Sequence, residues 1–382
     1  MKSNNEILIY AHYFLPAKNA GGPPKSLANL IDATKDQFKF KVICCNHEFK
    51  RPTEKFPGIK TGKWTEIECR KVMYLADGWR SFVKLIFEGF RRSSRVIYFN
   101  SFFDITYTII PLVTLAFFSS KKIIIAPRGE FSLGALSIKT RKKQFYLSLF
   151  RIFRLQQRVV WHATSVNEQA DLECFWGPKV EIILLPNFPD SKLPPPQMKT
   201  SKVPRKLRLI YLARIAKIKN LLGLLNALKR IKGHEIIFDI FGPLEDEMYW
   251  KDCTDAIDGL PQNITTCYRG VADGADVINI VSKYDLYVLL TSGENFGHTI
   301  FEALSASVPV LISDQTPWRQ LREKKAGWDL PISNIEGFTR ALEIAASWDN
   351  SQIRKQKKGA YTVAHDYAVD GARIQTAQKL FG

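Results

Sequence analysis

Short apolar runs alternate with stretches of helical periodicity along most of the chain. Runs of four to six residues rich in Ile, Val, Leu and Phe predict strands, and the stretches between them predict helices. Continuous apolar strands are typical of parallel sheets covered by helices on both faces, so the alternation predicts an α/β fold. The predicted strands are Ile7–Tyr10, Phe40–Cys44, Val96–Phe99, Ile123–Ala126, Arg158–Trp161, Leu207–Leu212, Ile236–Phe241, Thr265–Tyr268 and Leu286–Leu290. The predicted helices are Ser26–Ala33, Asn220–Ile231, Trp250–Ile257 and Asp276–Ser282.

The composition changes in the middle of the chain, where residues 191–204 hold a Pro-Pro-Pro run and many Lys and Ser residues. This segment is predicted to be a linker between two doubly wound, Rossmann-like domains, residues 1–190 and residues 205–361. A C-terminal helix over about 362–382 is predicted to pack back on the first domain. Two such sheets in series predict a cleft between their carboxyl ends.

The net charge is +18, of which residues 1–190 contribute +13 and residues 191–382 contribute +5. A basic N-terminal half favours an anionic partner. The alternative interpretation is that the positive charge serves only to keep the protein soluble. Within it, Lys139–Arg158 is basic and amphipathic, which suits either a helix on anionic lipid or a helix packed on the sheet.

The six cysteines form no C-x-x-C pair and show no metal-ligand spacing, which favours free thiols in a reducing compartment. The most apolar stretch, Ile105–Ser120, contains Pro111 and is shorter than the about 20 residues of a spanning helix. No signal peptide is evident before the first strand. The chain is therefore predicted to be cytoplasmic, with contact to the inner face of the membrane as a peripheral protein.

Two carboxylates, Glu294 and Glu302, flank a glycine turn that precedes an apolar helix predicted to begin near Thr299. A helix start presents free N–H groups to an anion, and carboxylates accept hydrogen bonds from hydroxyl groups. A ligand that carries both an anionic group and hydroxyl groups fits this site, and a nucleotide sugar is such a ligand. Stabilisation of Glu302 by the helix dipole, from a place in the first turn, is the simpler alternative, but it leaves Glu294 unexplained.

Two further segments combine glycine or positive charge with the end of a predicted strand. Gly21 and Gly22 lie between the first strand and its helix, where the backbone can approach phosphate; a plain turn explains them equally well. Arg214 and Lys219 follow the first strand of the second domain and suit a departing diphosphate, with Lys217 as a competing choice and solvated surface lysines as the default. The absence of any Asp-x-Asp predicts that no metal and no other cofactor assists the diphosphate.

Together these motifs resemble the retaining GT-B glycosyltransferases of family four, which include bacterial capsule and lipopolysaccharide enzymes. The resemblance spans nearly the whole chain, and its most specific element is the Glu-x7-Glu spacing of Glu294 and Glu302. The other matching segments are Gly21-Gly22, Pro127-Arg128-Gly129, Pro186-Asn187, the Arg-x4-Lys pair Arg214 and Lys219, and Gly242-Pro243. Ser307 stands where many members have glycine.

The resemblance implies a role for each matching residue. Arg214 and Lys219 would neutralise the diphosphate, Glu294 would bind the donor sugar and Glu302 the ribose. The implied donor-binding residues are Gly21, Gly22, Tyr268, Arg269, Gly270, Asn295, Phe296, Gly297, His298, Thr299 and Glu302. The family's usual His-Asp pair is not evident, and Arg128, Gly129 and Glu130 are assigned to its place on the acceptor side.

The sequence thus predicts a retaining, metal-independent enzyme that moves a sugar from a nucleotide diphosphate sugar to a glycan or lipid-linked acceptor in surface polysaccharide synthesis. A sugar phosphorylase or nucleotide-sugar epimerase of the same fold is one alternative. A non-enzymatic protein that binds polyanions is the other, and the chain lacks the aromatic and basic interleaving of single-strand nucleic-acid binders.

Overall fold

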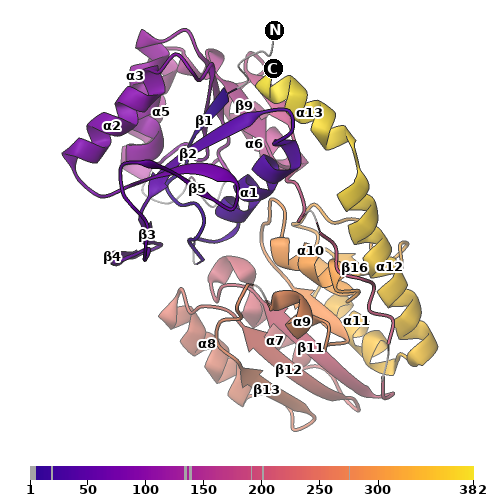
Figure 1. The fold of residues 1–382 in the computed structure, drawn as a ribbon. Coiled ribbons are helices and arrows are strands. Elements are labelled where there is room, and N and C mark those ends of the chain that lie inside the picture. The colour runs from indigo at the N-terminus through magenta and orange to yellow at the C-terminus, as the bar shows by residue number, and fades with distance from the viewer. Residues whose placement is uncertain are drawn as a thin grey trace. The chain divides into compact units, whose positions relative to one another are not determined.

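The computed structural model describes residues 6–18, 20–132, 136, 140–190, 192–199, 202–274 and 276–382. The chain divides into two compact units: Met1–Ser191 with Gly371–Gly382, and Lys192–Asp370 (Figure 1). Each unit is built on its own sheet with helices on its faces, which is the doubly wound α/β architecture that the alternating pattern predicts.

The first unit contains an eight-stranded sheet with the order β10-β9-β8-β7-β1-β2-β6-β5. Its strands are β1 (Glu6–Tyr10), β2 (Lys39–Cys45), β5 (Trp64–Ile67), β6 (Arg70–Leu75), β7 (Val96–Phe99), β8 (Lys122–Ile125), β9 (Val160–Ala163) and β10 (Glu181–Leu184), and a separate two-stranded sheet holds β3 (His47–Glu48) and β4 (Arg51–Lys55). All neighbours in the large sheet are parallel except β5 and β6. These two strands form a hairpin because Glu68 and Cys69 both have positive φ, 48° and 63°, as a two-residue turn requires.

Side chains that alternate along the strands divide the core of this unit between the two faces of the sheet. In β1, Ile7 and Ile9 face one side, and Leu8 and Tyr10 face the other. The first side is covered by α1 (Gly22–Thr34) and α13 (Ala372–Phe381). The second side is covered by α2 (Trp79–Phe90), α3 (Ile110–Phe118) with the preceding π-helix η1 (Ile105–Ile109), α5 (Thr140–Ile152) and α6 (Val166–Trp176), and a 3-10 turn η2 (Leu155–Gln157) follows α5.

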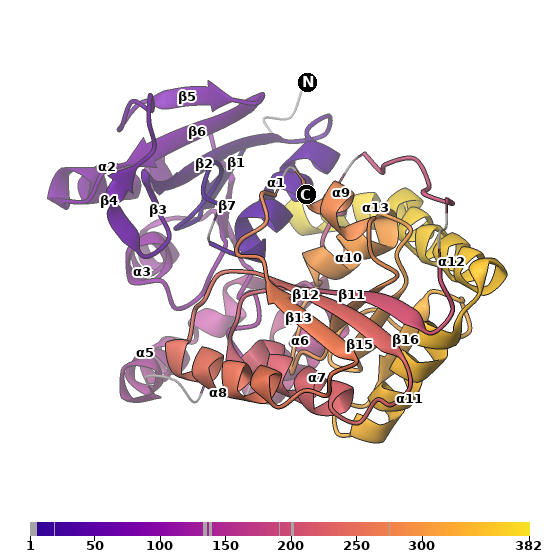
Figure 2. The ribbon, with the colours of Figure 1, turned by 90° about the horizontal axis from the view of Figure 1, so that it is seen from below.

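The second unit contains a six-stranded sheet, all parallel, with the order β13-β12-β11-β14-β15-β16 (Figure 2). Its strands are β11 (Lys206–Leu212), β12 (Glu235–Phe241), β13 (Ile264–Tyr268), β14 (Leu286–Leu289), β15 (Val310–Ser313) and β16 (Gly327–Leu330). Its helices are η3 (Lys217–Lys219), α7 (Leu221–Leu228), α8 (Glu247–Asp258), α9 (Val277–Val281), α10 (His298–Ser305), α11 (Ile335–Ser347) and α12 (Asn350–Val369). Helix α7 packs against α8 and α11, and α10 packs against α9 and α12.

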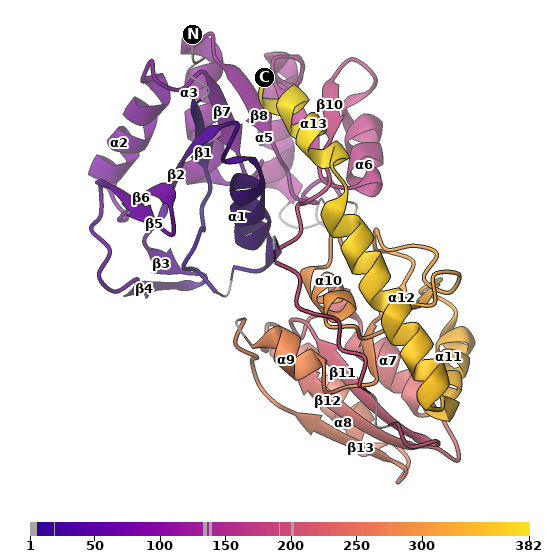
Figure 3. The ribbon, with the colours of Figure 1, turned by 45° about the vertical axis from the view of Figure 1, so that its right-hand side comes forward.

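The C-terminal segment differs from the single helix expected over 362–382. Helix α12 ends at Val369, and α13 begins at Ala372, so that α12 belongs to the second unit and α13 to the first (Figure 3). The break falls at Asp370 and Gly371, two residues of low helix propensity, and Asp370 is extended with ψ of 107°.

The described residues of the expected linker contain no helix or strand, but they are bound to the second unit. The N–H of Gln197 donates to Oγ of Ser307 at 2.9 Å, and Lys357 Nζ donates to the carbonyls of Gln197 and Lys199 at 3.2 Å each. Ser307 itself has a φ of 59°, the conformation that favours glycine at a helix end. Its buried hydroxyl therefore has a role, as the acceptor that holds the linker, which glycine could not fill.

The apolar stretch over 105–120 forms η1 and α3 on the sheet. No helix in the described part of the chain is long and apolar enough to cross a membrane. The amphipathic segment begins with Lys139, which lies outside the described residues, and continues as α5.

A candidate active site at the carboxyl edge of the second sheet

The loop that follows β11 carries both predicted phosphate-binding cations. Arg214 lies two residues beyond the strand, and its guanidinium is paired with the carboxylate of Glu245. Lys219 ends the 3-10 turn η3 and is buried, at 8% exposure. Its ammonium group is paired with the carboxylate of Glu294. Lys217, the competing choice, lies on the same turn and is exposed.

The loop that follows β14 carries Glu294, and hydrogen bonds to the carbonyl of Ile218 hold this loop against the one after β11. The N–H of Ser292 donates to the carbonyl of Ile218 at 2.7 Å, and Oγ1 of Thr291 donates to the same carbonyl at 3.1 Å. The N–H of Glu294 donates to the carbonyl of Gln315 at 2.9 Å. Because β11 and β14 are neighbours in the sheet, the two loops start side by side, and this adjacency brings Lys219 to Glu294.

Helix α10 begins directly after this loop. Gly297 caps it with a φ of 77°, and a Cβ at that position would lie 2.7 Å from Cδ1 of Ile300. Thr299 is fixed by a 2.7 Å hydrogen bond between its hydroxyl and that of the buried Tyr287. The first N–H groups of such a helix have no acceptor within it and carry the positive end of its dipole.

Aromatic side chains pack around the N-terminus of α10 and fix its orientation. The carbonyl of Phe296 accepts a 2.6 Å hydrogen bond from Nε1 of Trp318. The rings of Phe296, Phe301 and Trp318 pack on Tyr367 of α12, with centroids 5.0–6.0 Å apart. Phe296 is therefore a core side chain, and only its backbone remains a candidate for donor contact.

The position of Glu302 differs from the expected first turn of the helix. Helix α10 begins at His298, so Glu302 is its fifth residue, and its first turn contains no acidic side chain. Stabilisation by the helix dipole falls off beyond that turn, so the simpler explanation for this carboxylate loses its basis. Glu302 is partly buried and lies on the same helix as Thr299.

Residues 268–270 form the end of β13 and its following turn, at the same edge of the sheet. Tyr268 donates its hydroxyl to the carbonyl of Gly242 at 2.8 Å, and the N–H of Gly242 donates to the carbonyl of Gly270 at 2.8 Å. Arg269 donates through Nε to Oδ1 of Asp239 at 3.0 Å, while half of its side chain remains exposed. The turn is thus held rigidly, with the Tyr268 side chain 37% exposed.

The structure therefore gathers the predicted residues of the second unit at one edge. They follow β11, β13 and β14, and in a parallel sheet the carboxyl ends of all strands lie on the same side. The sequence reasoning missed Tyr287 and Glu245, which hold Thr299 and Arg214. Tyr287 lies within an apolar strand and gave no signal, because its role depends on a residue of the following helix.

Gly21 and Gly22 belong to the first unit and lie at the start of α1, after β1. Gly21 caps the helix with a φ of 77°, and prolines occupy the second and third positions of the helix, after Gly22. Helix α1 therefore begins at Gly22, four residues before the predicted start, because proline is well suited to the first turn.

Arg128, Gly129 and Glu130 follow β8 in the first unit, and each is fixed by hydrogen bonds. Arg128 has a φ of 55° and donates to Asn100, Asn187 and the hydroxyl of Tyr98 at 2.8–2.9 Å. The N–H of Gly129 donates to Oε1 of Glu168 at 2.6 Å. These contacts place Arg128 in a structural network.

The carboxyl of Glu130 has a raised pKa, which is a property of residues that act as a general acid or base. Burial raises the pKa of its carboxyl to about 7, although the N–H groups of Phe102 and Phe103 and the hydroxyl of Ser101 donate to it and the negative charge of Asp104 adds to the rise. Near neutral pH it therefore exchanges between both states, whereas carboxyls of ordinary pKa are fully ionised.

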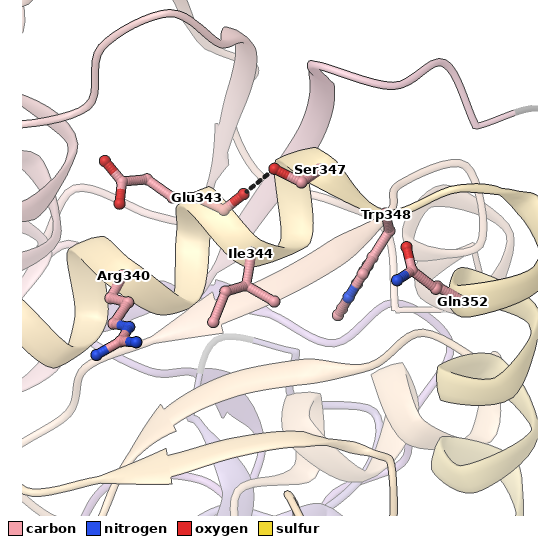
Figure 4. Close-up of a pocket in the computed structure, with 6 residues that line it drawn as sticks. All are labelled: Arg340, Glu343, Ile344, Ser347, Trp348 and Gln352. Carbon is pink, nitrogen blue, oxygen red and sulfur yellow. Dashed lines mark hydrogen bonds between the residues drawn. The ribbon is translucent and has the colours of Figure 1, made fainter.

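The second unit also has a pocket that is separate from the predicted donor-binding residues of that unit. It lies along α11 and the start of α12, where Ser347 donates to the carbonyl of Glu343 at 2.9 Å (Figure 4). The adjacent Ala346 accepts from the N–H of Arg205, the residue before β11, so the pocket lies toward the amino edge of the sheet. It contains none of the predicted site residues.

Comparison with known proteins agrees with this architecture. Residues 197–360 match the family model described as glycosyl transferases group 1, and this segment lies in the second unit. The GtfA subunit of the UDP-N-acetylglucosamine–peptide N-acetylglucosaminyltransferase of Streptococcus gordonii is 26% identical over 199 residues. That match covers 47% of this chain, and the chain spans only 36% of the length of that relative.

Solved structures match over nearly the whole length of both chains. HepE from Anabaena, in complex with UDP and glucose, has a TM-score of 0.71 at 15% identity, with 98% of each chain covered. Sucrose-phosphate synthase from Thermosynechococcus elongatus has a TM-score of 0.74 at 14% identity, again with 98% of each chain covered. The chain thus has the two-domain GT-B fold, and its residues 197–360 are similar to the group 1 glycosyl transferases.

Proposed function

We propose that this chain, which combines the GT-B fold with a group 1 glycosyltransferase domain, transfers a sugar from a nucleotide diphosphate donor to a hydroxyl group. One observation carries the proposal: the buried Lys219 is paired with Glu294 beside the start of α10, at the carboxyl edge of the sheet. A carboxylate for sugar hydroxyls and an ammonium group for phosphate thus lie in direct contact. The UDP and glucose in the related HepE structure support a nucleotide-sugar donor.

The proposed roles follow the chemistry of each group. Glu302 would accept hydrogen bonds from the ribose, and Glu294 would accept them from the donor sugar. Arg214, Lys219 and the first N–H groups of α10 would take up the charge that develops on the departing diphosphate, so that no metal ion is required. The base would lie against the turn at 268–270, where Tyr268 offers an exposed ring.

We further propose that the anomeric configuration is retained through attack on the face from which the diphosphate leaves. Glu294 is the carboxylate that we assign to the donor sugar, but its pairing with Lys219 weakens it as a nucleophile. The acceptor oxygen would form the new bond to the anomeric carbon as the bond to the diphosphate oxygen breaks. The electron pair of that bond would go to the diphosphate, which would take the proton from the acceptor hydroxyl.

Calorimetric titration with UDP, GDP and ADP tests the donor site directly. One nucleotide should bind clearly better than the others, and Glu302→Ala should weaken that binding by about tenfold or more, because a hydrogen bond to a charged group contributes about 1.5–3 kcal/mol. Glu323→Ala removes an exposed carboxylate from the same unit and serves as the matched control.

The reaction itself is then tested with the preferred nucleotide attached to a panel of sugars. Turnover that requires an acceptor alcohol supports the proposal. Turnover that requires inorganic phosphate would instead identify a phosphorylase, and turnover that requires neither would identify an epimerase. Salt-dependent binding of polyanions without affinity for any nucleotide would contradict all three enzymes and favour a polyanion-binding protein.

The first unit also carries a surface that suits an anionic membrane, where a lipid-linked acceptor for surface polysaccharide would lie. Three of its helices expose apolar side chains at helical spacing. The exposed side chains are Trp79, Val83, Phe87 and Phe90 on α2, Ile110, Val113, Phe117 and Phe118 on α3, and Phe145, Leu149 and Ile152 on α5. Helix α2 packs against α3, and the ring of Phe117 contacts that of Phe153 just after α5 at 5.3 Å between centroids.

The charges on these helices match this interpretation. Helices α2, α3 and α5 contain a single acidic residue, Glu88, which is buried and bonded to Arg91 at 3.1 Å. The basic residues on and directly after α2 and α5 include Arg80, Lys84, Arg91, Arg92, Arg141, Lys143, Arg151 and Arg154. Exposed aromatic rings among cations are typical of helices that lie in the interface of an anionic bilayer. The amphipathic face of α5 is thus turned to solvent, and we propose that its partner is anionic lipid.

The double variant Trp79→Ser/Phe87→Ser tests this surface, since both side chains are more than 70% exposed and their loss leaves the core intact. Binding to vesicles of phosphatidylcholine with phosphatidylglycerol should fall by more than about tenfold, because each large apolar side chain contributes about 1.5–3 kcal/mol when buried. Met248→Ser is the control, since Met248 is 79% exposed on α8. Equal binding by the double variant and the wild type would contradict the assignment.

A further inference from the structure

A cluster of metal-binding side chains lies at the carboxyl edge of the first sheet. His12 follows β1, Cys45 ends β2 and His47 lies in β3. Their nearest ligand atoms, one from each side chain, lie within 4.8 Å of one another. Cys45 and His47 are buried, and His12 is about one-third exposed.

The hydrogen bonds of the two imidazoles leave the same nitrogen for a ligand on each ring. Nδ1 of His12 lies 2.5 Å from Oδ2 of Asp104, and Nδ1 of His47 lies 3.1 Å from the carbonyl oxygen of Glu48. An Nδ1–H that donates to an oxygen fixes the tautomer in which Nε2 carries a lone pair. A carboxylate or carbonyl behind each imidazole is also the arrangement that orients histidine ligands in metal sites.

Two more features fit a bound cation. The carboxylate of Asp77, which follows β6, lies 3.8 Å from Nε2 of His47 and is mostly exposed. It can supply a fourth ligand, or water can take that place. The rings of Tyr13 and Tyr107 lie 4.3 Å and 5.0 Å from the His12 ring, centroid to centroid, and form an aromatic wall around it.

We propose that His12, Cys45 and His47 bind a zinc ion. Two imidazoles and one thiolate are ligands that zinc prefers, whereas magnesium and calcium prefer oxygen. Tetrahedral zinc, with bonds of about 2.0–2.3 Å, holds its ligand atoms about 3.3–3.6 Å apart, so atoms that now lie within 4.8 Å need to close by at most about 1.5 Å. The ion would tie together the segments that follow the neighbouring strands β1 and β2, and through Asp77 the loop after β6.

The site is independent of the proposed sugar transfer and is tested by metal binding alone. Purified protein without a histidine tag should hold about one zinc per chain after dialysis against a weak chelator. The cobalt-substituted protein should show the near-ultraviolet charge-transfer band of a thiolate bound to Co²⁺. Cys45→Ser should abolish this band, and His47→Ala should weaken zinc binding by tenfold or more.

Two controls separate this site from adventitious binding. Cys69→Ser and His365→Ala remove exposed side chains of the same types and should leave zinc content and the cobalt spectrum unchanged. Should Cys45→Ser not fold, His12→Ala removes the partly exposed ligand, and zinc should then no longer raise the unfolding temperature as it does in the wild type. A wild-type cobalt complex without the thiolate band would overturn the proposal. So would His12→Ala and His47→Ala variants that hold zinc as tightly as the wild type.

Discussion

Replacing Lys219 by Ala should lower turnover of the donor by about 100- to 1,000-fold, which corresponds to the about 3 kcal/mol lost with one preorganised group that stabilises a developing oxyanion. Lys219 is buried and held in place by its ion pair with Glu294, so the proposed contact with the diphosphate would use a side chain that is already ordered. Steady-state kinetics with the preferred donor measures the effect, which should appear in kcat more than in KM because the charge on the diphosphate grows in the transition state.

Lys217→Ala is the matched control, because Lys217 lies on the same 3-10 turn with its side chain exposed. It should retain turnover within about twofold of the wild type. If both lysine variants lost activity equally, a general effect of surface charge would explain the result and the assignment of Lys219 would be wrong.

Lys219→Ala also leaves the carboxylate of Glu294 without its partner, so a loss of stability could imitate a loss of catalysis. The double variant Lys219→Ala/Glu294→Ala removes both charges and should recover most of the unfolding free energy that the single variant loses. Turnover should stay low in both. Activity that returned together with stability would assign Lys219 a structural role.

Gly242→Ala should destabilise the second unit by about 3 kcal/mol or more, because steric overlap and backbone strain each cost about 1–3 kcal/mol. Gly242 has a φ of 144°, and a Cβ there would lie 1.8 Å from the carbonyl oxygen of Ala213, so the backbone must move. Moving it disturbs the contacts of Gly242 with Tyr268 and Gly270, so donor binding should weaken as well. Urea unfolding, together with calorimetric titration of the preferred nucleotide, measures both effects.

Gly259→Ala provides the comparison within the same unit. Gly259 ends α8 with a φ of −88°, and a Cβ there would approach no atom closer than 3.7 Å. The unfolding free energy should change by less than about 1 kcal/mol, and in the stabilising direction if the smaller entropy of the unfolded chain dominates. A Gly242→Ala variant as stable as Gly259→Ala would show that the loops after β11 and β12 adapt, contrary to their described geometry.

The strands predicted from sequence were those that a short apolar run marks by itself. Strand β7 occupies Val96–Phe99 as predicted, and β12 and β14 differ from prediction by one residue at one end. These are continuous apolar runs between polar turns, so their character does not depend on the partner strand. Strand β4 was missed because all five of its residues are exposed, and β5 because it is half-buried and lacks an apolar run. Strands β6 and β10 were also missed, although each contains a short apolar run.

Residues at the helix ends, rather than the spacing of hydrophobic residues, decided where these helices begin and end. The prolines at the start of α1 and the Asp-Gly pair between α12 and α13 decided the ends that differ from prediction. The exposed apolar faces of α2 and α5 could not be assigned from sequence, because periodicity shows that a helix has an apolar face but not what covers it.

The sequence by itself determined the α/β class, the sites of most strands and the identity of the charged residues beside glycine turns. Each of these depends on neighbours within a few positions along the chain. Only the tertiary structure decided that Lys219 meets Glu294, 75 residues away, and that His12 meets Cys45 and His47. Both meetings follow from strand order, β11 beside β14 and β1 beside β2, which is set by long-range pairing that no local pattern specifies.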